Sequence, residues 1–357
     1  MKVILTSIIK SYSIKRGYSM RFKPLFCFLV FLGLTNSIFA RDVVNIYTSR
    51  HYTTDKEIYK KFSEHTGVIV REISAKDQIL LERLKNEGDN SPADVLILSD
   101  AARLWRATQA GLFQKYKNKL IEQRIPKSLK SKDNWIGLTI RARIIVYDKR
   151  KFNKNDFSTY SDLGKPLFKN EFCSRSVTHP YMLSLLSSLI LNLGEIEAKT
   201  LSKNLVLNQA RKPQGGDTDQ IRAVGAGECG VALTNSYYLI RLMRSAKPRD
   251  IETMKNIGFL FPNQKGSGTH INVTGAGILK NAPNLENAKL FLTFLTEADT
   301  QKMFSYGNNE WPAVKRLKTE NQILDNLSDF KKDELNTEAI GSKQFTAQKI
   351  ADQVGWQ

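Results

Sequence analysis

The chain has 357 residues, more than one hydrophobic core usually serves, so two domains are expected. Its composition, 41% hydrophobic and 25% charged, excludes a disordered or low-complexity protein. The formal net charge of +19 falls to about +13 without residues 1–40, which hold six basic residues and no acidic one. Because the other basic residues are spread among acidic ones, a solvated surface is favoured over a nucleic-acid partner. Weak adhesion to an anionic membrane or wall is a further alternative.

The first forty residues have the order of a secretory signal peptide. Basic residues at 21 and 23 precede an apolar run from Pro24 to Leu34, and the small residue Ala40 follows. The run is shorter than the roughly 20 residues of a membrane-spanning helix. We therefore expect a cleavable signal peptide over residues 1–40, with Met20 as an alternative start of translation.

Short apolar runs then alternate with helical patterns. We expect strands at 43–49, 68–74 and 93–99 and helices at 54–67, 77–88 and 100–113. Thr54 or Asp55 is expected to cap the first helix, Gly67 to end it and Asp100 to begin the third. This β-α-β-α-β order is typical of an α/β fold with a parallel sheet.

A second α/β unit is expected after residues 135–148, "WIGLTIRARIIVYD", an apolar run unusually long for one strand. Such a length suits a segment that runs from one lobe into the next. Strands are then expected at 171–177, 230–235, 257–263 and 271–279, and helices at 183–194, 217–227 and 284–304. The sequence leaves open whether Cys173 and Cys229 form a disulfide or remain free core residues.

Four tyrosines fall where expected strands end. Tyr52 follows His51 after the first strand, Tyr181 follows the first strand of the second unit, and Tyr237 and Tyr238 follow "GVALTN". In open parallel sheets, ligands bind at the carboxyl ends of strands beside helix N-termini, so these phenols are expected to face one cleft. The alternative is that they are half-buried packing residues, the common role of tyrosine.

A cluster of phenols favours ferric iron as the ligand. The phenolate ion is a hard oxygen donor, and hard cations prefer oxygen ligands. A free tyrosine has a pKa of about 10, so only a strongly Lewis-acidic cation holds it deprotonated at neutral pH. Fe³⁺ meets this condition, whereas Ca²⁺ and Mg²⁺ do not. The four tyrosines therefore predict a ferric site.

The chain also contains "YTSRHYTTD", "SPADVLILSDAARLWRA", "RARIIVYD", "TNSYYLIRL", "FPNQKGSGTHINVTGAGILKNAPN" and "FSYGNNEWPAV". Together these segments, from Asp42 to about Val314, resemble the periplasmic ferric-iron-binding proteins of bacterial ABC importers, most closely the cyanobacterial branch. The resemblance implies a two-lobed α/β periplasmic-binding-protein fold of type II, with two crossing strands as the hinge and the ligand cleft between the lobes. We expect an N-terminal lobe of 41–139 plus 262–315 and a C-terminal lobe of 140–261 plus 316–357.

The resemblance also implies which residues hold the metal. The family's adjacent iron-binding tyrosines match Tyr237 and Tyr238. In the cyanobacterial branch, a tyrosine that follows a histidine in the first loop matches Tyr52, which makes His51 a fifth ligand or a neighbour of the ligands. A further tyrosine of the second lobe matches Tyr181, although "THPYMLSL" departs from the family's wording there.

Arginines are expected beside the metal. Arg141 or Arg143 of "RARIIVY", and Arg241, match positively charged positions near the family's site. Four phenolates and Fe³⁺ leave one negative charge, which one arginine would balance. Arg241 lies three residues after Tyr238, on the same helix face. We expect Arg241 to approach the metal on reduction, so that the site also accepts Fe²⁺; a solvated Arg241 is the alternative.

These expectations describe an exported solute-binding protein that is not an enzyme. It would capture Fe³⁺, and also Fe²⁺, close its lobes over the metal and act in the periplasm as a monomer. Its partners would be an inner-membrane ABC permease and the ATPase that powers it. Alternatives with the same fold bind an oxyanion or a polyamine. An exported hydrolase is disfavoured because the sequence has neither G-x-S-x-G nor H-E-x-x-H.

Overall fold

The first lobe is built on parallel strands in the computed structural model, which describes residues 42–131 and 133–357. Strands and helices alternate in the expected order: β1 (Val43–Thr48), α1 (Thr53–Thr66), β2 (Ile69–Ser74), α2 (Asp77–Glu87), β3 (Val95–Leu98) and α3 (Ala101–Gln109). β1 pairs in parallel with both β2 and β3, as the β-α-β pattern predicts. The expected signal peptide over 1–40 and the alternative start at Met20 lie outside the described residues.

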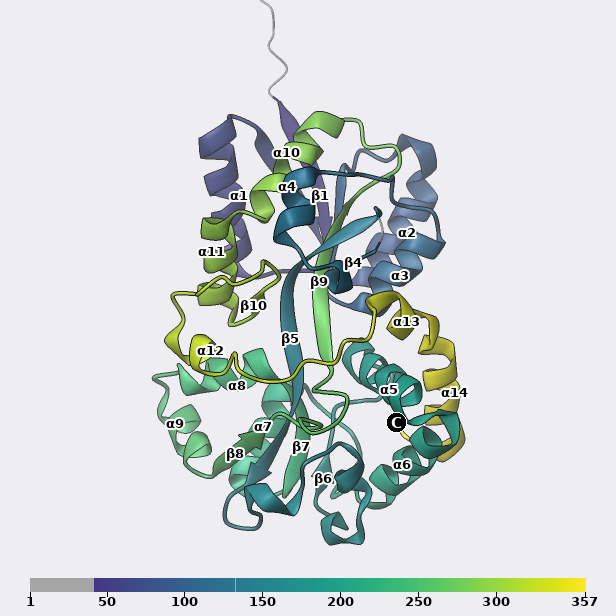
Figure 1. Ribbon diagram of the computed structural model, residues 1–357, viewed down its shortest axis with the longest axis vertical. Helices are drawn as coiled ribbons and strands as arrows, with labels where there is room; N and C mark the ends of the chain where they lie inside the picture. Colours follow the sequence, from purple (N-terminus) through teal and green to yellow (C-terminus); the bar gives the residue numbers. More distant parts are fainter. Residues whose placement is uncertain (1–41, 132) are drawn as a thin grey trace, which may run out of the picture. The chain divides into compact units, whose positions relative to one another are not determined.

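One strand runs through both lobes. β5 (Trp135–Asp148) is buried along its whole length, and its bounds are those of the predicted apolar run. Residues 136–142 of β5 pair antiparallel with β9 (Ile271–Ile278). Residues 143–148 pair with β7 (Val231–Asn235) and β8 (Ile257–Leu260). β5 and β9 are the central strands of Figure 1, and β5 therefore joins the two lobes.

The second lobe places helices around β5, β7 and β8. Its other elements are β6 (Phe172–Cys173), α5 (Pro180–Leu193), α6 (Glu195–Leu207), α7 (Asp217–Ala226), α8 (Ser236–Met243) and α9 (Pro248–Lys255). The strand expected at 171–177 is wrong in its length: only Phe172 and Cys173 pair with β7, and the bend that follows contains Arg175, which contacts Asp217. Cys173 and Cys229 form a disulfide with Cα atoms 5.9 Å apart, which answers the question that the sequence left open.

The single helix predicted over 284–304 is two helices, α10 (Leu285–Leu295) and α11 (Ala298–Asn308). The Thr296 hydroxyl donates to the carbonyl of Thr293 (2.8 Å), and Arg124 donates to the same carbonyl (3.3 Å) and to Thr296 Oγ1 (3.1 Å). Glu297 then adopts an extended backbone and precedes α11. Side chains thus satisfy a carbonyl that a continuous helix would have used, and the helix ends.

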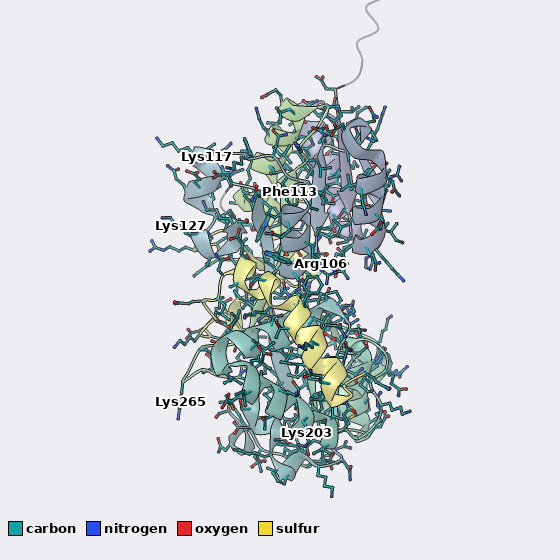
Figure 2. All side chains as sticks on the ribbon, turned by 90° about the vertical axis from the view of Figure 1, so that its right-hand side faces the viewer. Arg106, Phe113, Lys117, Lys127, Lys203 and Lys265 are labelled. Carbon is teal, nitrogen blue, oxygen red and sulfur yellow. A yellow bond between two sulfur atoms is a disulfide. The ribbon has the colours of Figure 1, made fainter. Side chains whose placement is uncertain are left out.

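The C-terminal segment contacts both lobes. α12 (Gln322–Asn326) lies beside Trp311, whose indole Nε1 donates to the Leu324 carbonyl (3.1 Å). α13 (Thr337–Ser342) packs against α3 of the first lobe, and α14 (Gln344–Val354) packs against α5 and α6 of the second. Figure 2 shows α13 and α14 in yellow, with Arg106 of α3 beside them.

Short elements connect these parts. They are α4 (Lys119–Arg124), β4 (Lys130–Ser131), β10 (Trp311–Pro312) and 3₁₀ turns at Gly88–Asn90, Lys127–Leu129, Lys154–Asp156, Ser161–Gly164 and Pro166–Phe168. Figure 2 labels Lys117 and Lys127, which flank α4 at one edge of the first lobe. Among residues 42–131 and 133–357, no helix is long and apolar enough to cross a lipid bilayer.

Candidate metal site

Four tyrosines line one cavity. The cavity has a volume of about 240 Å³, and Tyr52, Tyr181, Tyr237 and Tyr238 contribute to its wall together with His51. Tyr52 immediately precedes α1, Tyr181 is the second residue of α5, and the adjacent pair lies in the first turn of α8. Three helix N-termini, one from the first lobe and two from the second, therefore bring these phenols together.

The rings of these tyrosines lie close to one another or to His51 at the cavity wall. The hydroxyls of Tyr181 and Tyr237 are 3.4 Å apart. The ring centroids of Tyr237 and Tyr238 are 4.1 Å apart, and the His51 ring stacks on Tyr52 at 5.2 Å. Tyr237 is buried, the other three tyrosines are half-buried, and His51 is exposed at the rim. The phenols pack against one another and also converge on the cavity.

The start of α1 differs from the sequence expectation. Thr54 or Asp55 was expected to cap this helix, but Tyr52 is the N-cap residue and offers no side-chain hydrogen bond. Asp55 lies inside the helix, and its carboxylate accepts two hydrogen bonds from the buried Arg50, at 2.9 and 3.1 Å, instead of capping the helix. This buried ion pair fixes the backbone on both sides of Tyr52.

Burial favours the protonated form of three of the tyrosines in the metal-free protein. Burial raises the pKa of Tyr52 and Tyr181 above the ordinary tyrosine value, and the pKa of Tyr237 well above it. For Tyr181 the nearby Arg141 guanidinium acts in the opposite direction and lowers the pKa. A cation that binds these oxygens must therefore displace protons.

Two of the three expected arginines lie beside the phenols. The Arg141 guanidinium is 5.1 Å from the ring centroid of Tyr181. The Arg241 guanidinium lies 5.0 Å from that of Tyr238. Arg143 instead binds Asp217 at 2.6 Å and lines no part of the cavity. Arg241 is exposed and donates a hydrogen bond to a threonine hydroxyl of α7 at 2.7 Å.

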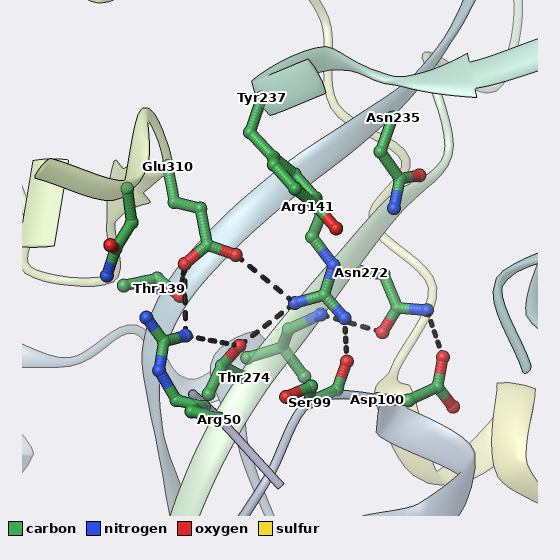
Figure 3. Close-up of polar contacts among 12 residues, drawn as sticks. Arg50, Ser99, Asp100, Thr139, Arg141, Asn235, Tyr237, Asn272, Thr274 and Glu310 are labelled. Carbon is green, nitrogen blue, oxygen red and sulfur yellow. Dashed lines mark hydrogen bonds and ion pairs between the residues drawn. The ribbon is translucent and has the colours of Figure 1, made fainter. Parts of the chain in front are cut away.

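A buried network behind the cavity was not anticipated from the sequence. Glu310 accepts from Arg50 at 3.0 Å and lies 3.7 Å from Arg141, as Figure 3 shows. Both arginines also donate to the hydroxyl of Thr274, and Arg141 donates to the carbonyl of Ser99. Glu310 lies in "FSYGNNEWPAV", but it is 260 residues from Arg50, so no local pattern could have indicated the contact.

His179 and Arg175 are two further neighbours of Tyr181. His179 precedes α5, and its Nδ1 accepts from the Tyr181 amide at 3.3 Å. Burial, with Arg175 as the next contributor, lowers the pKa of His179 to about 2, so the ring is neutral and acts as an acceptor. The Arg175 guanidinium lies 5.3 Å from the Tyr181 ring centroid. A search for spacing motifs could not have found Arg175, because its role depends on the turn after β6.

The carboxylates on the cavity wall have partners of their own. Asp77 pairs with Arg103 at 2.5 Å. Asp100 accepts hydrogen bonds from the Ala102 amide, the Asn272 amide nitrogen and the Ser184 hydroxyl. In the part of the chain that the structure describes, no three His, Cys, Asp or Glu side chains are grouped to hold a metal ion. The phenol oxygens are the donor set that the cavity presents.

The class of protein follows from the fold together with sequence comparison. Residues 90–335 match the family model described as "Bacterial extracellular solute-binding protein". The chain therefore belongs to this family of bacterial extracellular solute-binding proteins.

Individual relatives share most of the chain. Iron uptake protein A1 of Synechocystis is 42% identical over 88% of this chain and 87% of its own length. A Trichodesmium FutA structure, in complex with iron and citrate ligands, has a TM-score of 0.84 and 44% identity over 88% of this chain and 100% of that one. A ferric binding protein of Campylobacter jejuni has a TM-score of 0.82 and 40% identity over 88% and 100% of the two chains. The predicted two-lobed type II fold is therefore confirmed.

Proposed function

We propose that this protein is an iron carrier that binds Fe³⁺ through the oxygens of Tyr52, Tyr181, Tyr237 and Tyr238. The observation that carries the proposal is the convergence of four phenols on one cavity of about 240 Å³. Phenolate is a hard donor that suits a strongly Lewis-acidic cation. His51 acts either as a fifth ligand or through its stacking on Tyr52.

Arginines beside the phenols support the same cargo. Fe³⁺ with four phenolates carries one net negative charge, and a partly buried site needs a nearby positive charge to balance it. The guanidinium groups of Arg141 and Arg241 lie 5.1 and 5.0 Å from the ring centroids of Tyr181 and Tyr238. Arg143 supports the site indirectly, since it donates a hydrogen bond to the side chain of Asn235, which lies two residues before Tyr237.

Delivery is proposed to an ABC importer. The donors come from both lobes, so closure around the metal is the natural motion of the hinge. The protein is exported by a cleavable signal peptide and acts in the periplasm as a monomer. It delivers iron to an inner-membrane permease and its ATPase. The names of its relatives, iron uptake protein A1 and ferric binding protein, support this role.

Two alternative cargoes of the same fold have less support. A polyamine needs free carboxylates between aromatic walls, but Asp77 and Asp100 already have partners. An oxyanion needs several donors without carboxylate partners; Arg103 is paired with Asp77, which leaves Arg241 as the one described arginine of the cavity wall without such a partner.

A thermal-shift experiment discriminates these cargoes. Apo protein is mixed with ferric citrate, spermidine or phosphate, with citrate alone as the control. A ligand that binds only the folded state at 100 times its Kd stabilises it by about 2.7 kcal/mol. Only ferric citrate should raise the Tm. A shift with spermidine or phosphate and none with iron would refute the proposal.

A further inference from the structure

A single buried carboxylate joins the two segments that carry the second-lobe phenols. Asp217, the first residue of α7, is fully buried. Its Oδ2 accepts from the amide of Asn235 at 2.8 Å and from Arg143 at 2.6 Å, and its Oδ1 lies 3.3 Å from Arg175 Nη1. Asn235 ends β7 two residues before Tyr237. Arg175 lies in the turn before Tyr181.

The charges around the cavity are unevenly balanced. On the first-lobe side, the buried arginines Arg50 and Arg141 are matched by the carboxylates of Asp55 and Glu310, so this cluster has no net charge. The neighbouring Asp100 is an acidic residue, so it adds no positive charge to this cluster. Arg141 therefore contributes a positive charge that its own partners already offset.

The second-lobe cluster has a surplus. Arg143 and Arg175 share the single carboxylate of Asp217, which leaves one positive charge. Arg143 is tied to Asp217, to the Asn235 side chain and to the Leu233 carbonyl. Among the described residues, Arg175 has one carboxylate contact, the longer one of 3.3 Å to Asp217, and its guanidinium lies over the Tyr181 ring. Of these two arginines, Arg175 is the one whose guanidinium lies beside a phenol of the cavity, 5.3 Å from the Tyr181 ring centroid, so the surplus charge is assigned to it.

Burial makes this charge more effective than that of Arg241. The Arg175 side chain is 13% exposed, whereas Arg241 is exposed to solvent, which screens its charge. We propose that Arg175, oriented by Asp217, is the positioning residue whose charge balances the ferric site at Tyr181. This inference rests on the proposed function, because it assigns the compensating charge of that same site.

The experiment asks whether ferric binding depends on the positive charge at position 175 or on the shape of the arginine side chain. Ferric affinity is measured by competition with a chelator of known strength for wild type, Arg175→Gln and Arg175→Lys. The matched control is Arg83→Gln, since Arg83 also lies over a tyrosine ring, at 5.0 Å from that of Tyr47, and pairs with a carboxylate, but its tyrosine does not line the cavity. The Tm of each apo protein and the visible absorption of each iron-saturated protein are recorded.

We expect Arg175→Gln to lose ferric affinity by about 10- to 100-fold, Arg175→Lys to stay within about threefold of wild type, and Arg83→Gln to match wild type. The visible absorption band of iron-saturated Arg175→Gln should persist, because the tyrosine ligands are unchanged. Equal losses in the Gln and Lys variants, no loss in either, or a lost band at saturation would overturn the inference. Wild-type protein that binds no Fe³⁺ would instead refute the proposed function.

Discussion

Tyr237 and Tyr238 combine ring packing with a place on the cavity wall, and the two roles can be separated. Phenylalanine keeps the ring contacts and removes only the hydroxyl. Changes in residues that merely support a metal ligand already cost about 10–100-fold in affinity. We therefore expect Tyr237→Phe and Tyr238→Phe each to lower ferric affinity at least about tenfold, while the Tm of the apo protein changes little.

Tyr147→Phe is the matched control for this prediction. Tyr147 is buried in the same lobe, packs edge-on against Phe157 and does not line the cavity. Affinity and Tm are measured for all three variants. If the two cavity variants lost apo stability and kept their affinity for iron, the adjacent tyrosines would be packing residues only.

Arg241 allows a prediction about oxidation state. Reduction to Fe²⁺ leaves a second negative charge on four phenolates, and at an effective dielectric near 20 two charges 4 Å apart interact by about 4 kcal/mol. Arg241 is solvent-exposed and held by one hydrogen bond, so it is free to approach the metal. We expect Arg241→Ala to weaken Fe²⁺ binding more than Fe³⁺ binding.

Anaerobic titration with each ion measures the difference. Arg249→Ala is the control, since Arg249 is an exposed arginine of the neighbouring helix α9 outside the cavity. Equal losses for both ions, or no loss for either, would show that Arg241 is a solvated helix residue.

At the level of elements, the contact between α13 and α3 depends on a glycine. A Cβ atom added at Gly341 would lie 2.3 Å from the Cβ of Trp105, an atom that cannot move without its backbone. Overpacking of this kind typically costs about 1–3 kcal/mol. We expect Gly341→Ala to lower the Tm. Gly266→Ala should not, because its nearest neighbour is 3.8 Å away and its backbone is not left-handed.

A differential scan of both variants tests the contact. An unchanged Tm in Gly341→Ala would mean that the C-terminal segment does not pack on the first lobe in solution. α13 also contacts α5 of the second lobe, and α14 packs against α5 and α6, so the C-terminal segment keeps its second-lobe contacts through α14 when the contact of α13 with α3 is weakened.

Elements were predictable where their pattern is local. The apolar run at 135–148 gave the bounds of β5, because a strand buried on both faces shows no polar interruption. The prediction of a single helix over 284–304 was wrong, because the break between α10 and α11 involves Arg124, which is far away in the chain. The phenols that meet at the cavity could be named from strand ends, whereas Glu310 and Arg175 depend on tertiary contacts that no local pattern encodes.

At the level of the whole molecule, binding should depend on pH. Burial raises the pKa values of Tyr52, Tyr181 and Tyr237, so these phenols are protonated in the apo protein at neutral pH and release protons when a metal binds. Protons therefore compete with iron, and affinity should fall as pH falls. A chelator competition between pH 8 and pH 5 measures this, and an affinity that rose in acid would exclude phenolate ligands.

The central claim is that tyrosinate oxygens hold ferric iron, and one spectrum tests it most directly. Apo protein is titrated with ferric citrate, and bound iron is quantified while visible absorption is recorded. Phenolate bound to Fe³⁺ gives a ligand-to-metal charge-transfer band, so the protein should turn orange to red and saturate at one iron per chain. A colourless protein that holds stoichiometric ferric iron would contradict the account.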